Sequence, residues 1–174
     1  MIPVCPACGA SLPRHARCVP LGRALALIGG LALVAAYFMP WFGISSPQGS
    51  VVLTGEFLGR FLANTNDLSR FMPGSSGDPS EARLLRGLVY LFPTSGALAA
   101  LVACIATFRP GLRGPANVVL ALLGLVPLVA LVLGVSRLPP GASQEVGLRL
   151  IGVGSIAILV GLALEAALGA RRTL

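Results

Sequence analysis

The stretch Ala24–Phe42 reads ALALIGGLALVAAYFMPWF and contains no charged residue. At about 1.5 Å per residue, a helix of this length covers roughly the 30 Å hydrocarbon thickness of a bilayer. Arg23 precedes the stretch, and Tyr37, Trp41 and Phe42 gather near its other end, where amphipathic rings favour the headgroup level. The stretch therefore predicts a first transmembrane helix.

Three further apolar stretches follow it, and arginine, proline or glycine separates them. The sequence predicts an all-α membrane protein, a bundle of four transmembrane helices with a small N-terminal zinc-knuckle-like head. The expected segments are a head over 1–22, spans over 23–42, 87–108, 114–136 and 146–169, an outer loop over 43–86 and a tail over 170–174. Small residues recur at four-residue spacing, such as Ala26 with Gly30 and Gly96 with Ala100, and this spacing favours close helix packing in lipid.

Composition supports a membrane domain. The chain has 174 residues, of which 55% are apolar and 11% charged, and a soluble core of this length needs more charge on its surface. The net charge of +7 comes from thirteen Arg and no Lys. Because these Arg residues are scattered, with no run longer than Arg171-Arg172, we expect the lipid bilayer as a partner and not nucleic acid.

The head carries the one recognisable motif. Cys5-Pro-Ala-Cys8-Gly9 is followed by Leu12 and Pro13, and a turn of this kind presents two thiolates side by side. It resembles the short zinc ribbons at the head of many bacterial small membrane proteins, in which CPxCGxxLP precedes a second CxxCG knuckle. The second knuckle departs from that pattern, because Cys18 and Gly22 are in place but Leu21 occupies the position of the last Cys.

A structural zinc site needs four ligands. The resemblance implies one Zn²⁺ held by Cys5, Cys8 and Cys18, and His15, three residues before Cys18, is the best fourth candidate. The alternative is a degenerate ribbon in which His15 is merely solvated. A redox CxxC is less favoured, because such motifs begin a helix in a βαβ unit.

The outer loop contains an amphipathic segment. Thr54 is placed to cap a short helix with Phe57, Leu58, Phe61 and Leu62 on one face. This segment is expected to lie on the bilayer surface, or alternatively to dock a partner. Four aromatic side chains are the predicted membrane-interface or partner contacts: Trp41, Phe57, Phe61 and Phe71.

No catalytic constellation is recognisable, so the sequence predicts a protein that is not an enzyme. The spans contain no His, and we therefore expect no haem or chlorophyll ligated by the chain's own intramembrane His. The favoured function is a non-catalytic scaffold or accessory subunit that associates with other membrane protein subunits. The alternative is a small transporter or channel that uses the kinks expected at Pro93 and Pro127 in the second and third spans.

Location and orientation follow from the spans and the Cys residues. A multi-pass protein of the cell inner (plasma) membrane is expected, with both termini cytoplasmic. This orientation places seven arginines inside and six outside, a small margin for the positive-inside rule. The inside set lies in short segments beside the spans, which favours the orientation: Arg14, Arg17, Arg23, Arg109, Arg113, Arg171 and Arg172. A cluster of reduced thiols also belongs in the cytoplasm.

Overall fold

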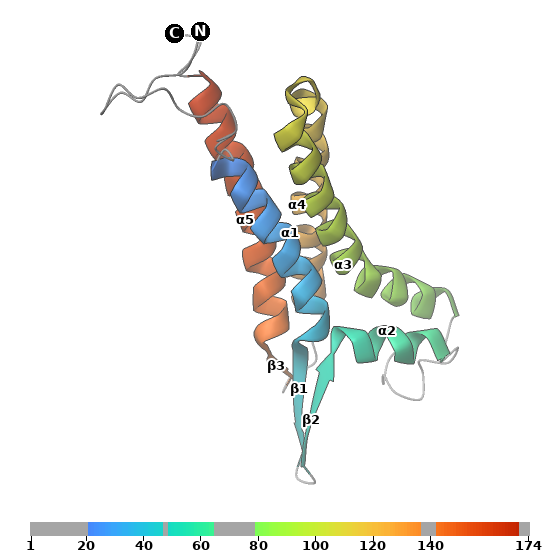
Figure 1. The fold of residues 1–174 in the computed structure, drawn as a ribbon. Coiled ribbons are helices and arrows are strands. Elements are labelled where there is room, and N and C mark those ends of the chain that lie inside the picture. Colours follow the sequence, from blue (N-terminus) through green and yellow to red (C-terminus); the bar gives the residue numbers. More distant parts are fainter. Residues whose placement is uncertain (1–20, 47–48, 65–78, 137–141, 171–174) are drawn as a thin grey trace, which may run out of the picture.

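The computed structural model describes residues 21–46, 49–64, 79–136 and 142–170. This part of the chain is mostly helical (Figure 1), with α1 (Leu21–Phe38), α2 (Gly55–Asn64), α3 (Pro79–Phe108), α4 (Arg113–Val135) and α5 (Val146–Ala170). A 3₁₀ turn, Pro110–Leu112, joins α3 to α4. Four of these described helices (α1, α3, α4 and α5) are long and apolar enough to cross a membrane, which agrees with the four apolar stretches that the sequence predicts as spans.

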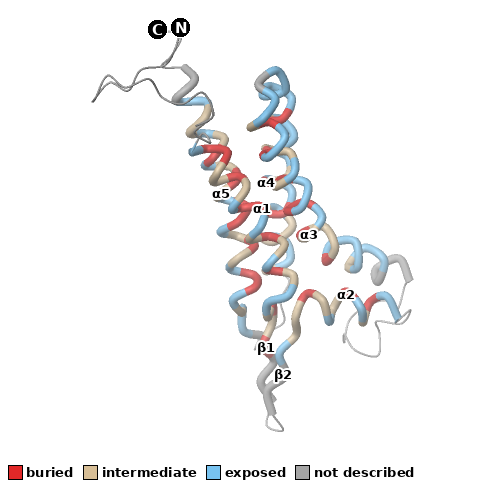
Figure 2. The backbone as a smooth tube through the Cα atoms, viewed as in Figure 1, coloured by how far each residue is buried: buried red, intermediate tan, exposed pale blue. Residues whose placement is uncertain are grey.

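The four long helices form one bundle, in which α1 packs against both α5 and α3, and α4 packs against α5 and α3. Buried residues concentrate where these helices face each other (Figure 2). Leu33 of α1, Leu120 of α4 and Ile158 of α5 are completely buried. The core is therefore assembled from side chains of several helices.

Two adjacent glycines of α1 contact two different helices. A Cβ atom placed on Gly29 would lie 2.5 Å from the carbonyl oxygen of Gly154 in α5. One placed on Gly30 would lie 2.7 Å from the carbonyl oxygen of Gly96 in α3. Both distances are too short for a real side chain, so the backbones of α5 and α3 approach α1 as closely as small-residue packing in lipid allows.

The expectation of an all-α fold is corrected by a small sheet at one end of the bundle. Its strand order is β2-β1-β3, formed by β1 (Pro40–Ser46), β2 (Gly49–Thr54) and β3 (Ala142–Gln144). Both pairings are antiparallel, and a bulge interrupts the first between Pro40 and Phe42. The sheet ties the segment after α1 to the segment before α5.

The helix α1 ends at Phe38, four residues before the end of the uncharged stretch. Pro40 cannot donate the backbone hydrogen bond that would continue the helix, and it disfavours helical geometry at the preceding residue. Trp41 and Phe42 consequently belong to β1. An apolar run that reads as one span thus contains a helix followed by the start of a strand.

The helix α2 follows β2 directly, and the backbone N–H of Phe57 donates to Thr54 Oγ1 at 3.1 Å. The predicted cap is therefore confirmed. α2 lies beside the first turns of α3 at the sheet end of the bundle (Figure 1). Its Gly59 allows close approach, since a Cβ there would lie 2.9 Å from the Tyr37 hydroxyl and 3.2 Å from that of Tyr90.

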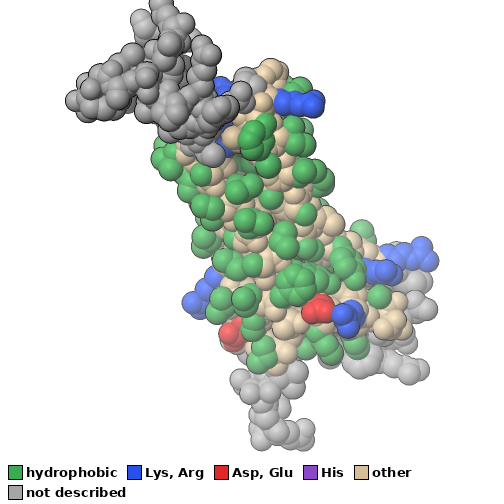
Figure 3. Space-filling view, viewed as in Figure 1, with side chains coloured by type: hydrophobic (Ala, Val, Ile, Leu, Met, Phe, Trp, Pro, Cys, Tyr) green, Lys and Arg blue, Asp and Glu red, His purple; other side chains and the backbone are tan. Residues whose placement is uncertain are grey.

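The outer surface is apolar between two charged ends. Figure 3 shows hydrophobic side chains over the middle of the bundle, blue side chains toward both ends and red side chains toward the lower end. Exposed apolar residues such as Leu101, Leu122 and Val153 lie on three different helices. This distribution fits a lipid environment around the bundle.

Candidate functional site

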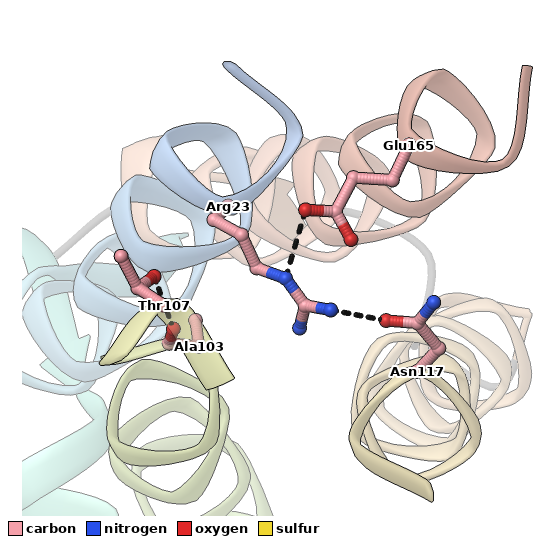
Figure 4. A network of polar contacts seen from close by, with 5 residues as sticks. All are labelled: Arg23, Ala103, Thr107, Asn117 and Glu165. Carbon is pink, nitrogen blue, oxygen red and sulfur yellow. Dashed lines mark hydrogen bonds and ion pairs between the residues drawn. The ribbon is translucent and has the colours of Figure 1, made fainter. Parts of the chain in front are cut away.

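A buried polar cluster (Figure 4) lies at the end of the bundle opposite the sheet (Figure 1). Arg23 is only 2% exposed. Its Nε atom donates to Glu165 Oε1 at 2.8 Å, and its Nη2 atom donates to Asn117 Oδ1 at 2.6 Å. One guanidinium therefore connects α1 with α5 and α4.

The chain direction explains why these three residues meet. Arg23 is near the start of α1, Asn117 is near the start of α4, and Glu165 is near the end of α5. Because the chain reverses direction between successive spans, these helix ends lie together (Figure 1). Close packing at Gly22 and Gly161 also brings α1 and α5 together beside the cluster, since a Cβ on Gly22 would overlap the Gly161 carbonyl oxygen.

The ion pair compensates two charges that would otherwise be costly in a low-dielectric environment. The side chain of Arg23 is 1% exposed and that of Glu165 is 15% exposed. Removing such charges from water costs several kcal/mol per ion, which the partner charge offsets when hydrogen bonds are well made. The pair thus joins α1 to α5 at a position where the protein itself shields both charges from water.

One donor group of the cluster is unused. The Nη1 atom of Arg23 is buried and has no hydrogen-bond partner. The nearby hydroxyl of Thr107 is already engaged, because it donates to the Ala103 carbonyl oxygen of its own helix at 2.8 Å. Nη1 is therefore the one nitrogen of this guanidinium that has no acceptor.

The predicted metal ligands cannot be compared with the cluster. Cys5, Cys8, His15 and Cys18 lie outside the described residues, and so does Phe71. Within residues 21–46, 49–64, 79–136 and 142–170, no group of three or more His, Cys, Asp or Glu side chains could hold a metal ion. The zinc site remains a prediction.

The structure places the other predicted contact residues in two settings. Trp41 is 3% exposed, donates from Nε1 to the Ala36 carbonyl oxygen at 2.7 Å and meets the Phe92 ring edge-on at 5.3 Å. It therefore belongs to the chain's own core. Phe57 is 55% exposed and stacks on Phe61 along α2, with ring centroids 6.2 Å apart.

Sequence reasoning missed the cluster because each member resembled an ordinary interface residue. Arg23 directly precedes the first apolar stretch and Glu165 lies near the end of the last one, positions at which a charged side chain can reach water by snorkelling. In the structure the two side chains instead pair with each other. The sequence did contain an indication of the pair. In a four-span bundle the start of the first span and the end of the last lie on the same side of the membrane, so opposite charges at these two places can meet.

Comparisons with protein-family models, with curated proteins and with solved structures found no match for this chain.

Proposed function

We propose that the chain is a non-catalytic scaffold or accessory subunit of a larger membrane assembly, and that α4 provides its partner-binding face. The observation that carries this proposal is the uneven burial of the spans. In the most apolar part of α4, 17% of the residues are buried, against 39% for α1. A helix that is so exposed on a tightly packed bundle offers the broadest surface for another subunit.

The closely packed glycine faces of α1 support this assignment, because they contact helices of the same chain and are not available to another subunit. Gly29 contacts α5 and Gly30 contacts α3, so these parts of α1 serve the chain's own fold. The outward residues of α4 are instead large and apolar, and they run along most of the helix: Val118, Val119, Leu122, Leu125, Val126, Val129, Val132 and Leu133. A partner helix can pack against such a face through van der Waals contact.

The polar groups of the spans do not favour transport. A pore needs polar groups or carbonyl oxygens that face water. Thr94, Ser95 and Thr107 instead donate to carbonyl oxygens of their own helix, and Asn117 binds Arg23. Pro93 and Pro127 do lie inside α3 and α4, but a proline kink alone makes no path for a substrate.

Photocrosslinking in native membranes tests the proposal. A photoreactive amino acid at Leu122 or Val126 of α4 should give one and the same discrete protein adduct. The matched control is Leu98 of α3, which is 50% exposed, against 56% for Leu122, and it should react with lipid. Lipid adducts alone from all three positions would contradict the scaffold assignment.

The proposal includes the orientation and the head expected from the sequence, with both termini cytoplasmic and one Zn²⁺ on Cys5, Cys8, Cys18 and His15. Labelling of a Cys introduced at Ser76 by an impermeant reagent in intact cells checks the orientation, because this position is then outside. Protection of that Cys from the reagent would mean that position 76 lies inside and both termini lie outside.

For the metal, we expect about one zinc per chain in the purified protein and a marked loss in Cys5→Ser, because three protein ligands hold zinc less well than four. Elemental analysis measures the ratio. Cys104→Ser is the matched control, since Cys104 is a free thiol on α3, and it should keep its zinc. A ratio near zero in the unsubstituted protein would exclude the site.

A further inference from the structure

The unused donor of Arg23 points to a ligand site. A guanidinium has five N–H donors in a fixed plane. The hydrogen bonds to Glu165 and Asn117 use Nε and Nη2, while Nη1 is buried and without a partner. Because a buried charged donor without an acceptor is strongly unfavourable, an acceptor that reaches Nη1 would be bound with a large gain.

The depth of the cluster favours one class of acceptor. Arg23, Thr107, Asn117 and Glu165 all lie within five residues of the ends of their helices. At 1.5 Å per residue, this is within about 7 Å of the helix ends, where the hydrocarbon core gives way to lipid headgroups. Phosphate oxygens are the abundant anionic acceptors at that level, and they match guanidinium geometry.

Nη1 is itself covered, so a phosphate reaches it only when side chains at this end of the bundle move aside. In Figure 4, Nη1 is directed away from Glu165 and toward the side on which α3 and α4 lie. The rim of the cluster is accessible, because the Glu165 side chain is 15% exposed and Asn117 is partly exposed. Exposed Arg109 and Arg113 lie at the same end, in and beside the α3–α4 connection, and would attract anions to it.

We propose that Arg23 Nη1, held in place by Glu165 and Asn117, binds a phosphate group at this end of the bundle. The phosphate belongs either to an anionic phospholipid or to a free phosphate compound. Glu165 offsets the guanidinium charge in the empty site, and Asn117 fixes the guanidinium plane so that Nη1 remains available. This site is independent of the α4 face assigned to a partner.

Titrations of the purified full-length protein in a neutral detergent test the proposal. Phosphatidylglycerol, phosphatidylcholine and inorganic phosphate are added separately at constant ionic strength, and thermal unfolding and native mass spectrometry report binding. Protection by phosphatidylglycerol well above that by phosphatidylcholine, with one lipid retained per chain, indicates a lipid phosphate. Equal protection by inorganic phosphate indicates a free phosphate compound. If neither anion protects the protein, the proposal is overturned.

Two variants separate the site from general surface charge. Asn117→Asp places a second carboxylate beside the guanidinium, so it keeps an acceptor for Nη2 but repels an anion at Nη1. We expect about tenfold or greater loss of phosphate affinity with a folded protein. The matched control is Arg113→Gln, which removes an exposed cation at the same end and should change the affinity less than about threefold. An equal loss of phosphate affinity in Asn117→Asp and Arg113→Gln would contradict the proposed site.

Arg23→Lys adds a test of the guanidinium itself. Lys keeps the positive charge for Glu165 but lacks the planar fork that presents Nη1. The expected loss of affinity is again about tenfold. If Arg23→Lys fails to fold, Asn117→Asp and the titrations of the unsubstituted protein still decide the question.

Discussion

Gly29→Ala should destabilise the bundle by about 1–3 kcal/mol, the usual cost of inserting a group into a well-packed core, and Gly29→Val should cost more. The added Cβ would lie 2.5 Å from the Gly154 carbonyl oxygen and 3.1 Å from the Ile158 backbone nitrogen. These are backbone atoms, so a rotamer change cannot relieve the overlap. The helices α1 and α5 would have to separate.

Separation is hindered because α1 is packed on a second side as well. The neighbouring Gly30 approaches α3 so closely that a Cβ there would lie 2.8 Å from the Ala100 backbone nitrogen. A shift of α1 away from α5 therefore alters the α1–α3 packing too. This two-sided contact is the reason why the effect of one methyl group should be large.

Unfolding of the purified protein in detergent, followed by heat or by added denaturing detergent, measures the effect. The matched control is Gly134→Ala in α4, because a Cβ at Gly134 meets nothing within 4 Å. That control should be neutral or slightly stabilising, since Ala favours helix over Gly. Equal stability of the two alanine variants would contradict the close α1–α5 packing.

The sequence predicts the features that depend on local composition. Apolar length identifies the four helices that could span a membrane, and Thr54 with an amphipathic pattern identifies α2. Small-residue spacing indicates close packing, but it does not indicate which helix faces which. That Gly30 meets Gly96 while Gly29 meets Gly154 depends on the three-dimensional arrangement.

The features that sequence reasoning missed depend on long-range pairing. The strand β1 begins inside an apolar run. Its partner β2 follows it directly in the chain, whereas β3 pairs with it from the distant segment before α5. Trp41 reads as an interface residue, yet it is enclosed because Gly55 and Gly147 leave room on either side of its ring. The partners in the Arg23–Glu165 pair are 142 residues apart, so no local pattern reveals it.

Replacing Glu165 of the Arg23–Glu165 pair should cause the second large loss of stability. Glu165→Ala leaves the Arg23 charge buried without its anion, and breaking a buried pair in this way costs about 3–5 kcal/mol. The same unfolding measurement applies. Glu56→Ala is the matched control, because it breaks the exposed Glu56–Arg60 pair of α2, which is formed at 2.7 Å. A helix-surface pair of that kind contributes only about 0.3–0.5 kcal/mol.

A double substitution separates the cost of an unpaired charge from the value of the ion pair. In Arg23→Met with Glu165→Met, both charges are replaced by apolar side chains of similar length, and such replacements are often neutral or stabilising. The double variant should therefore be more stable than Glu165→Ala, and close to the unsubstituted protein. That recovery in stability should not restore phosphate binding, because Nη1 is gone. A double variant as unstable as Glu165→Ala would mean that the polar contacts themselves, including the one from Nη2 to Asn117, hold α1, α4 and α5 together.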